Sequence, residues 1–581
     1  EMLRSLVGSE MCIRDSYRTG EKEKAFAVTL PHDAMQLDER SETSAGGVNI
    51  GWYEAQDYTY EKTFILPEKA KDEKVILEFE GVYHNVEVHL NGEKIASCPY
   101  GYSDFYADLT GKLLPGRDNV LEVIAHNADQ PNSRWYSGAG IYRDVTLHVL
   151  PKRHIPLDGV YVTTTHELES WTMTIDTELC GVKDNGVLTH VLLDGDVPVC
   201  DVTVEAAGDH ANAVMQVLSP KLWSPDAPNV YTLQTMLGNQ VIRQNVGFRD
   251  LTFTTDRGLL VNGAPVKLHG VCLHHDLGCL GSAFHEKAMR RQLRAMRQMG
   301  VNALRTSHNP PAKQVMDLCD ELGIFVVDEA FDMWLRAKTP FDYARFFPTD
   351  MPSDVAAWVR RDRNHPSLLM WSIGNEILDT HLDESAQQVT CDLCENVRLH
   401  DPRGNAIITI GSNFMPWEGA RKCADLVDAQ GYNYGEKYYE AHHAEHPDWV
   451  IYGSETASAL SSRGIYHFPM AASILSDEDL QCSALGNSTS SWGTKDMRKC
   501  IVEDLNTPYS LGQFLWSGID YIGEPTPYHT RSCYFGMMDT AVFPKDYWYL
   551  FKSLWTNAPM VHIGVCLLYT SDAADEARSV D

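Results

Sequence analysis

The stretch LLMWSIGNEI, residues 368–377, decides the fold expected for the second half of the chain. It begins as a largely apolar run of strand length and ends in the polar pair Asn375 and Glu376. A carboxylate at the end of a buried strand costs desolvation energy unless it is paired or used. In barrels of parallel strands, active sites form at the carboxyl ends of the strands. The stretch therefore indicates a barrel strand that carries catalytic residues at its end.

Seven other short apolar segments lie on either side of this stretch, separated by segments of helical spacing. We expect the eight strands at 266–274, 301–306, 324–330, 368–376, 405–410, 426–434, 449–455 and 512–521. The helices expected between them include 285–299, 312–322 and 385–399, and 547–555 would close the ring. Alternating strands and helices are typical of a parallel sheet, and eight repeats over roughly 300 residues have the size of a (β/α)8 TIM barrel.

The chain before residue 265 has the period of two that is typical of strands. Apolar and polar residues alternate at 75–80 and 86–90, and Asn91-Gly92 supplies a hairpin turn. A second alternating series runs from 159 to about 249. Short alternating strands punctuated by Gly and Pro favour β-sandwiches. Two all-β domains are therefore expected before the barrel, and a length of 581 residues also predicts a multidomain chain.

The charge of the chain argues against two classes of partner. Asp and Glu number 80 against 49 Lys and Arg, and the net charge of −31 would repel nucleic-acid phosphates and anionic lipid headgroups. No apolar run in the sequence is long enough to cross a bilayer. We therefore expect no nucleic acid and no membrane, and a neutral substrate fits better.

The cysteines and the chain ends bear on the compartment. The 14 cysteines are scattered, and the close pair Cys391 and Cys394 has no second pair to complete a zinc site. Structural thiols suit a reducing compartment, which favours the cytoplasm but leaves the localisation open.

Both ends, SLVGSEMCIRDS at 5–16 and CLLYTSDAADE at 566–576, resemble translated sequencing adapter. We treat 1–16 and 565–581 as non-native, so the true N-terminus is expected to be missing and no signal peptide can be read.

Two glutamates end apolar strands on nearly opposite sides of the expected barrel. Glu376 ends the fourth strand, and Glu455 ends the seventh, in WVIYGSET. The aromatic residues Trp371, Tyr434 and Trp516 lie at or near strand ends and suit the apolar faces of a sugar ring. Each glutamate taken alone is as well explained as a salt-bridged rim residue. The two together, with aromatic residues beside them, favour catalysis.

Hydrolysis of a glycosidic bond requires two carboxyl groups. One carboxylic acid protonates the leaving oxygen, and a carboxylate acts on the other side of the anomeric carbon. At a separation of about 5–5.5 Å the carboxylate attacks directly, forms a glycosyl-enzyme, and the configuration is retained. The acid keeps its proton because the neighbouring carboxylate raises its pKa until that carboxylate becomes glycosylated. The sequence thus predicts a retaining glycosidase.

Longer motifs extend this prediction to a family. The stretches NALRTSHNPPAKQVMDLCDELGIFVV at 302–327 and DRNHPSLLMWSIGNE at 362–376 resemble signatures of glycoside hydrolase family 2, the β-galactosidase, β-glucuronidase and β-mannosidase group. SRWYSGAGIYRDV at 133–145, LWSPDAP at 222–228 and FLWSGIDYIGEP at 514–525 are also family-like. The resemblance implies a jelly-roll, sugar-binding-like β-sandwich at 17–152, an immunoglobulin-like β-sandwich at 153–252 and the catalytic TIM barrel at 253–564.

The resemblance also implies roles for individual residues. Glu376 matches the acid/base, Glu455 the nucleophile, and Asn375 the residue that hydrogen-bonds the substrate 2-hydroxyl. The other implied site residues are Arg305 and Tyr434 as partners of the nucleophile, His308 in the glycone pocket and Trp516 beneath the sugar ring. In EAFDMW, Asp332 and Trp334 either reach the glycone hydroxyls or pack. His269, like His274 and His275, either contacts the substrate or is a structural histidine.

Two departures from the family pattern bear on the substrate. Several members send an acidic residue from the first domain into the sugar site, where this chain has Arg134. The Asn-x-Lys motif with which β-glucuronidases read a carboxylate has no evident match after the last strand. We therefore predict a retaining, exo-acting β-glycosidase for terminal β-galactosides, with β-glucuronidase, β-mannosidase and β-glucosaminidase as alternatives. No cofactor and no metal are expected, and a homo-oligomer stays open.

Two rival classes need different evidence. A metal-dependent barrel hydrolase would require a His-x-His pair at the end of the first strand, where His274 and His275 are adjacent, and the sequence has no H-E-x-x-H helix. Activity that survives chelation would exclude this class. A non-catalytic carbohydrate-binding protein would bind sugar without hydrolysing aryl β-glycosides. Because both glutamates are present, the enzyme is favoured.

Overall fold

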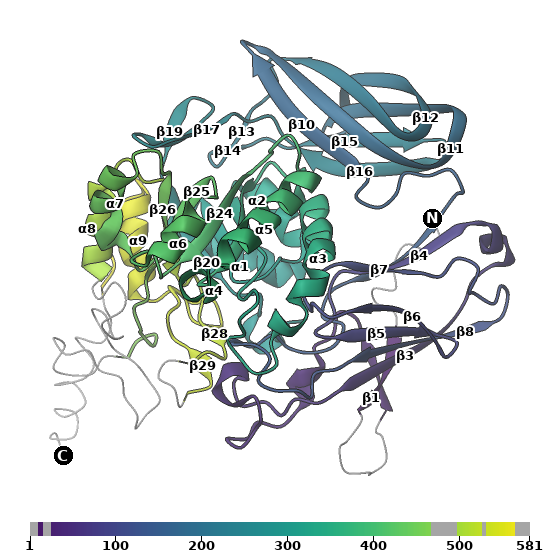
Figure 1. Cartoon of the computed structure of the whole chain (residues 1–581), viewed down its shortest axis with the longest axis horizontal. Helices are drawn as coiled ribbons and strands as arrows, with labels where there is room; N and C mark the ends of the chain where they lie inside the picture. Colours follow the sequence, from purple (N-terminus) through teal and green to yellow (C-terminus); the bar gives the residue numbers. More distant parts are fainter. Residues whose placement is uncertain (1–9, 16–24, 466–496, 526–529, 564–581) are drawn as a thin grey trace, which may run out of the picture.

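The computed structural model describes residues 10–15, 25–465, 497–525 and 530–563. Figure 1 shows two β-rich bodies on one side of the molecule and a helix-covered barrel on the other. The tail expected to be non-native at 565–581 lies outside the described residues, as do residues 1–9 and 16. No helix among the described residues is long and apolar enough to cross a membrane.

The first β-sandwich domain consists of a six-stranded and a three-stranded sheet. The six strands, in spatial order, are β2 (Ala25–Thr29), β1 (Glu10–Asp15), β3 (Tyr58–Ile65), β8 (Asp118–Ala125), β5 (Val86–Leu90) and β6 (Glu93–Cys98). The three are β7 (Phe105–Asp108), β4 (Lys74–Phe79) and β9 (Val145–Leu150). Alternate residues of both sheets, such as Val88 and Leu77, are buried in one core because side chains of a strand alternate between its faces. The turn predicted at Asn91-Gly92 joins β5 to β6, and both residues have positive φ.

The second β-sandwich domain folds one long ribbon onto itself. Its strands are β10 (Val160–Glu167), β11 (Ser170–Asp194), β12 (Val197–Leu218), β15 (Tyr231–Leu237) and β16 (Gln240–Val246). The first part of β11 pairs with β10 and its last part pairs with β15. Register shifts between these parts bend the β11–β12 ribbon, as β-bulges do. Trp171 and Ile175 from one part therefore share a core with Leu188 and Leu233 from the other.

Two small sheets, one of two strands and a linker sheet of three strands, join this domain to the barrel. The pair β13 (Trp223–Ser224) and β14 (Ala227–Pro228) is followed by β17 (Leu251–Thr254), β18 (Gly258–Val261) and β19 (Ala264–Val266). Leu259 and Val261 belong to one apolar cluster with Leu268, Ala303 and Phe325, which begin barrel strands. The linker sheet thus lies against the amino end of the barrel.

The predicted TIM barrel is confirmed as a closed barrel of eight parallel strands in sequence order. The strands are β20 (Leu268–Leu273), β21 (Ala303–Thr306), β22 (Phe325–Glu329), β23 (Leu368–Asn375), β24 (Ile407–Ser412), β25 (Ala429–Asn433), β26 (Ile451–Ala457) and β27 (Gly512–Trp516). The predicted strand at 512–521 was too long. β27 ends at Trp516, where the chain turns and the Gly518 N–H bonds the Cys272 carbonyl, and Tyr521 begins the separate strand β28 (Tyr521–Ile522), which pairs with β29 (Ser532–Cys533).

Helices cover the outside of the barrel (Figure 1). They are α1 (Glu286–Met299), α2 (Lys313–Leu322), α3 (Phe347–Asp362), α4 (Asp379–Leu382), α5 (Ala386–His400), α6 (Glu418–Ala424), α7 (Tyr439–Glu445), α8 (Met497–Asn506) and α9 (Asp546–Trp555). The four helices predicted from sequence correspond to α1, α2, α5 and α9. α1 and α2 both end at a glycine with positive φ, Gly300 and Gly323, as helices commonly do.

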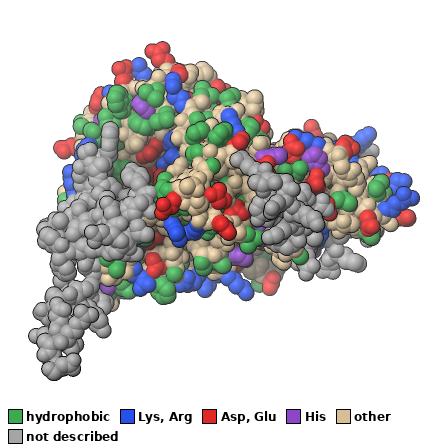
Figure 2. Space-filling model, turned by 90° about the horizontal axis from the view of Figure 1, so that it is seen from below, with side chains coloured by type: hydrophobic (Ala, Val, Ile, Leu, Met, Phe, Trp, Pro, Cys, Tyr) green, Lys and Arg blue, Asp and Glu red, His purple; other side chains and the backbone are tan. Residues whose placement is uncertain are grey.

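The outer surface carries both charges close together. On the face seen in Figure 2, acidic and basic side chains lie side by side near the centre of the molecule. The coloured part of this face is thus mixed in charge, although the full chain has a net charge of −31.

Candidate active site

The carboxyl ends of the barrel strands bring together most of the side chains predicted for the site. Arg305 lies in β21, Asn375 ends β23, Glu455 lies in β26 and Trp516 ends β27, while Glu376 and Tyr434 directly follow β23 and β25. Parallel strands end at one rim of a barrel, so residues 211 positions apart in sequence, from Arg305 to Trp516, meet there.

Arg305 is the hub of the site and is fully buried. Its Nε and Nη2 donate to both carboxylate oxygens of Glu329 at 2.8–3.0 Å, and its Nη1 donates to Oε1 of Glu455 at 2.8 Å. Nη2 also donates to Oδ1 of Asn375 at 2.8 Å. The planar guanidinium thus fixes two carboxylates and one amide in a single arrangement.

Glu455 is buried beside one cation and one phenol. Burial raises the pKa of Glu455 to about 8, and the charge of Glu376 adds to this rise, whereas Arg305 and the hydrogen bond from Tyr434 oppose it. The backbone N–H of Tyr434 also donates to the Glu455 carbonyl at 2.7 Å. An oxocarbenium-like transition state would carry positive charge next to this carboxyl group and so favour its ionised form.

Glu376 lies at the more open edge of the site, with a half-buried side chain. Asn433 Nδ2 donates to its Oε1 at 3.1 Å, and Asn433 pairs in register with Glu455. The two glutamates are therefore separated by the end of β25. The backbone of Glu376 has φ of +45°, a conformation that costs a non-glycine residue roughly 1–3 kcal/mol, and its N–H is held by the Gly411 carbonyl at 2.8 Å.

Asp332 and Asn375 form the next layer of the site. Asn375 Nδ2 donates to Oδ1 of Asp332 at 2.9 Å, and Lys338 Nζ donates to the same oxygen at 2.8 Å. Burial alone would raise the pKa of Asp332, but Arg134 and Lys338 hold it well below its usual range. Asp332 is thus an ionised carboxylate in a buried position.

His308 and Trp516 form an aromatic wall. Their rings stack at 5.2 Å with an interplanar angle of 5°. Burial and the nearby Arg305 charge lower the pKa of His308 far below its usual value, so the ring is neutral. His308 Nδ1 contacts Glu329 Oε1 at 2.7 Å, which makes Nδ1 the donor and leaves Nε2 without a proton, 3.8 Å from Glu455 Oε1.

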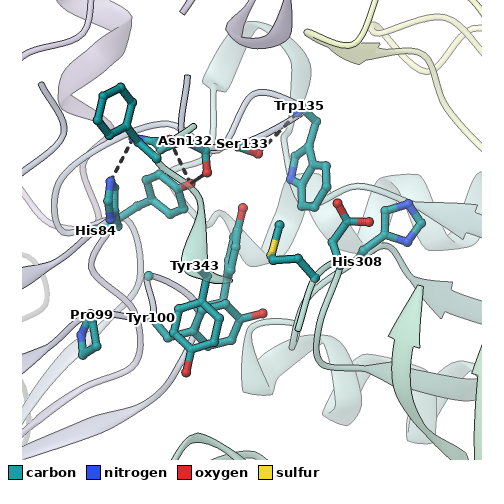
Figure 3. Close-up of a pocket in the computed structure, with 14 residues that line it drawn as sticks. His84, Pro99, Tyr100, Asn132, Ser133, Trp135, His308 and Tyr343 are labelled. Atoms are coloured by element: carbon teal, nitrogen blue, oxygen red, sulfur yellow. Dashed lines mark hydrogen bonds between the residues drawn. The ribbon is translucent and has the colours of Figure 1, made fainter. Parts of the chain in front are cut away.

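A pocket beside this cluster is lined by residues of the first β-sandwich domain, such as Trp135, and by His308 and Asp332 of the barrel domain (Figure 3). The rings of Trp135 and His308 meet edge to face there, with ring centroids 5.5 Å apart and an interplanar angle of 68°. Arg134 donates to both oxygens of Asp332, at 2.9 and 2.7 Å, and to Glu524 Oε1 at 2.7 Å. The site is therefore built from two domains.

Three residues named from the sequence do not join this cluster. Trp334 is fully buried, and its indole N–H bonds the Ile373 carbonyl at 3.0 Å. Trp371 packs edge-to-face on Trp358 of α3, on the outside of the barrel. His269 stacks on Trp555 at 4.8 Å, near the start of β20 and thus at the amino end of the barrel. A different group, His274, lies against His308, Trp516 and Tyr521.

Several residues of the site were not predicted. They are Glu329, Asn433, Lys338, Glu524 and Trp135. Glu329 and Asn433 end β22 and β25, so the rule that selected Glu376 would have found both. The other three come from loops and from the sandwich, where no strand pattern marks them.

One cluster of possible metal ligands lies away from this site. Asp317, Asp320 and His365 bring one ligand atom each to within 4.8 Å of one another. Burial would lower the pKa of His365, but Asp320 and other nearby carboxylates raise it to about 9. A protonated histidine is an ion-pair partner, and His365 Nδ1 lies 2.6 Å from Asp320 Oδ2. We interpret this cluster as an ion pair next to the second β-sandwich domain.

Comparisons with known proteins agree with this arrangement. Three family models match: "Glycosyl hydrolase 2 galactose-binding domain-like" at 41–144, "Glycosyl hydrolases family 2" at 154–249, and "Glycosyl hydrolases family 2, TIM barrel domain" at 253–410. The chain is 36% identical to beta-galactosidase BoGH2A of Bacteroides ovatus, over 92% of this chain and 69% of that protein. It is 30% identical to a putative beta-glucuronidase of Formosa agariphila, over 92% of this chain and 53% of that protein.

Solved structures also resemble the fold of this chain. A beta-glycosidase from Bacteroides vulgatus superposes with a TM-score of 0.84 at 30% identity, over 96% of this chain and 76% of that one. A glycosyl hydrolase family 2 member from Bacteroides cellulosilyticus also gives a TM-score of 0.84, at 27% identity, over 96% and 72% of the two chains. The chain thus spans between about half and three quarters of the length of these relatives.

Proposed function

Because the chain belongs to glycosyl hydrolase family 2, we propose that it is a retaining β-glycosidase in which Glu376 is the acid/base and Glu455 the nucleophile. The observation that carries the proposal is the pair of strand-end glutamates on either side of Asn433, close enough for the charge of Glu376 to raise the pKa of Glu455. Two carboxyl groups near each other at the rim of the barrel are what glycoside hydrolysis requires.

The proposed reaction has two steps. Glu376 donates a proton to the glycosidic oxygen while a carboxylate oxygen of Glu455 attacks the anomeric carbon, and the aglycone leaves as an alcohol. Glu376, now a carboxylate, then takes a proton from water, which attacks the same carbon and releases Glu455. Arg305 and Tyr434 stabilise the carboxylate of Glu455 before attack and as it leaves.

The charges of the pocket support a neutral glycone. In the described part of the mouth, Arg305, Arg134 and Lys338 each bond a protein carboxylate: Glu329 and Glu455, Asp332 and Glu524, and Asp332. The carboxylate of a uronide would have to compete with these pairs or stay unpaired, which is costly in a buried site. We therefore propose β-galactosides over β-glucuronides, as the name of the Bacteroides ovatus relative also suggests.

The assignment of the acid/base can be tested with leaving groups. We expect Glu376→Ala to lower kcat/KM roughly 10²- to 10⁴-fold for aryl β-galactosides with poor leaving groups and much less for those with good ones, because good leaving groups need little protonation. The measurement is a plot of log(kcat/KM) against the pKa of the released phenol. A slope unchanged from wild type would contradict the role.

The glycone can be tested in the same assay. Wild-type enzyme should turn over an aryl β-galactoside faster than the β-glucuronide, β-mannoside and β-glucoside with the same aryl group. Faster turnover of the glucuronide would move the proposal to the β-glucuronidase alternative, and binding without turnover of any of the four would leave a carbohydrate-binding protein.

A further inference from the structure

A polar pocket lies between the second β-sandwich domain and the barrel domain. It has a volume of about 270 Å³ and is lined by β10 and the segment after β16 on one side, and by the segments after α3 and α5 on the other. Those two barrel segments lead into β23 and β24, so the pocket lies at the amino end of the barrel, away from the catalytic rim. Whatever the pocket binds is therefore separate from the glycosidase reaction proposed above.

In the part of the chain that the structure describes, two arginines of this pocket donate hydrogen bonds to backbone carbonyls only. Arg249 donates to the carbonyls of Pro366 and Leu368, just before and at the start of β23. Arg363 donates to two other backbone carbonyls, at 2.6 and 3.0 Å. Burial lowers the pKa of both arginines to about 10, so both stay charged at neutral pH. Carbonyl groups accept hydrogen bonds but carry no opposite charge, so these two cations lack a bonded counter-ion among the described residues.

A third guanidinium, that of Arg403, brings another positive charge to the same pocket. Its carbon lies 4.3 Å from the centroid of the Tyr161 ring, and the carbon of the Arg363 guanidinium lies 4.6 Å from it. The ring face attracts both cations and so holds two like charges near each other. Arg403 also forms an ion pair with Asp176. The lining residues include one carboxylate, that of Asp250, whose side chain is 40% exposed and therefore well hydrated.

Two buried carboxylates lie near the pocket without lining it. Asp320 pairs with His365 at 2.6 Å, and Asp401 accepts hydrogen bonds from the Tyr161 hydroxyl at 2.7 Å and from the Trp371 indole N–H at 3.1 Å. Both attract Arg249 through space, but neither forms a hydrogen bond or an ion pair with it within the described chain. The lining of the pocket itself therefore has more positive than negative charge, in a chain whose net charge is −31.

Two further N–H groups add to the donors at this pocket. Arg363 is 4% exposed, and its Nε–H has no hydrogen-bond partner among the described residues. β10 is an edge strand, and the N–H of Val162 at its free edge donates to Oδ1 of Asn364 at 2.9 Å. Since alternate N–H groups of a strand point the same way, the N–H of Thr164 is also directed to the free edge, and Thr164 lines the pocket. Cations and N–H donors together are what an anion requires.

We propose that this pocket binds a tetrahedral oxyanion of the phosphate or sulfate class, either as the free ion or as the ester group of a small metabolite. Arg249 and Arg363 supply the charge, and the Thr164 N–H supplies a backbone donor. A guanidinium presents two parallel N–H groups that match two oxygens of such an anion. Because the ligands come from both domains, the bound anion would also stabilise the second β-sandwich domain against the barrel.

The test measures binding of inorganic phosphate to the full chain by isothermal titration calorimetry, with sodium chloride at the same ionic strength as the reference. Wild-type protein should bind phosphate in preference to chloride. Arg403→Gln and Asp176→Asn break the same ion pair but change the charge of the pocket in opposite directions. We expect Kd for phosphate to rise roughly 3- to 10-fold in Arg403→Gln and to fall by a similar factor in Asp176→Asn.

Arg249→Met should have a larger effect and has a matched control. It removes a proposed ligand, so Kd should rise roughly 10- to 100-fold, the size expected for a hydrogen bond to a charged group. Arg297 also donates to two backbone carbonyls, those of Val301 and Pro225, at 2.8 and 2.9 Å, but it does not line the pocket. Arg297→Met should therefore bind phosphate as tightly as the wild type.

Each outcome supports or overturns the anion site. Phosphate that binds no more tightly than chloride, or equally well to Arg249→Met and the wild type, would overturn it. A shift of Kd in the same direction in Arg403→Gln and Asp176→Asn would show a structural effect only, and this pair decides if Arg249→Met does not fold. Galactose 6-phosphate that binds more tightly than inorganic phosphate would assign the ester, and weaker binding would assign the free ion. Because the readout is binding, the result does not depend on the glycosidase activity.

Discussion

At the carboxyl end of the barrel strands, buried charges form one network around Glu455, whereas at the amino end charged side chains form separate pairs, such as His365 with Asp320, or bond loop carbonyls. Arg305 and Glu329 are fully buried at the carboxyl end and form a network with Glu455. At the amino end, Lys267 donates to the carbonyls of Thr507 and Ser510 and pairs with the partly exposed Asp504.

The difference lies in what each end does with its charges. The network at the carboxyl end holds one cation against two carboxylates, and the pKa of Glu455 rises to about 8 because burial disfavours this excess negative charge. The amino end closes with apolar packing and the stacked pair of His269 and Trp555. We infer that the buried charges at the carboxyl end lower the free energy of unfolding and serve the proposed reaction. The packing at the amino end only raises the free energy of unfolding.

The largest effect should come from the nucleophile. Glu455→Gln keeps the size of the side chain but removes the attacking carboxylate, so we expect turnover of aryl β-galactosides to fall roughly 10⁴-fold or more. Glu178→Gln, which weakens only the remote pair with Arg360, should keep nearly full activity. Turnover of Glu455→Gln above about one per cent of wild type, measured on protein free of wild-type enzyme, would mean that another group attacks.

An intermediate effect should come from the hub of the carboxyl end. Lysine in Arg305→Lys cannot reach Glu329 and Glu455 together, so we expect kcat/KM to fall roughly 10²- to 10³-fold. Arg305 lowers the pKa of Glu455, and its weakening should raise that pKa further above about 8. Because the nucleophile acts as a carboxylate, the acidic limb of the pH–rate profile should move to higher pH. An acidic limb at the same pH as in the wild type would show that Arg305 does not lower the pKa of Glu455.

The smallest effect on catalysis should come from the amino end. His269→Ala removes the stack on Trp555, so we expect the free energy of unfolding to drop by about 1–3 kcal/mol, with kcat/KM within twofold of wild type. A large loss of kcat/KM in a folded His269→Ala protein would restore the role in substrate binding that the sequence left open.

The same histidine predicts a pH dependence of stability. Burial lowers the pKa of His269 from about 6.5 to about 4, so the unfolded chain takes up this proton before the folded chain does. The stabilising contribution of His269 is therefore complete above pH 6.5 and decreases as the pH falls toward 4. In denaturant titrations, the stability difference between wild type and His269→Ala should narrow over this range, and a constant difference would contradict the burial of a neutral ring.

The sequence by itself determined the order of the barrel strands and the rim on which the catalytic residues lie. Apolar runs separated by helical spacing specify parallel strands, and parallel strands end at one rim, so local pattern alone places Glu376 and Glu455 near one another, while Arg305 came from the family resemblance. The two sandwiches followed from a strand period of two. All of these features depend on the order of apolar and polar residues along short segments, which a single sequence contains.

The tertiary structure decided which side each residue faces and which distant segments meet. Trp371 packs on α3 outside the barrel, while the next residue, Ser372, donates a hydrogen bond to Glu329 inside it. In a strand that is apolar throughout, the sequence does not show which alternate residues face the interior. Arg134 meets Asp332 across 198 residues and Glu524 across 390. Contacts between domains depend on the complete packing of both surfaces, so only the folded chain brings a sandwich arginine to the mouth of the barrel.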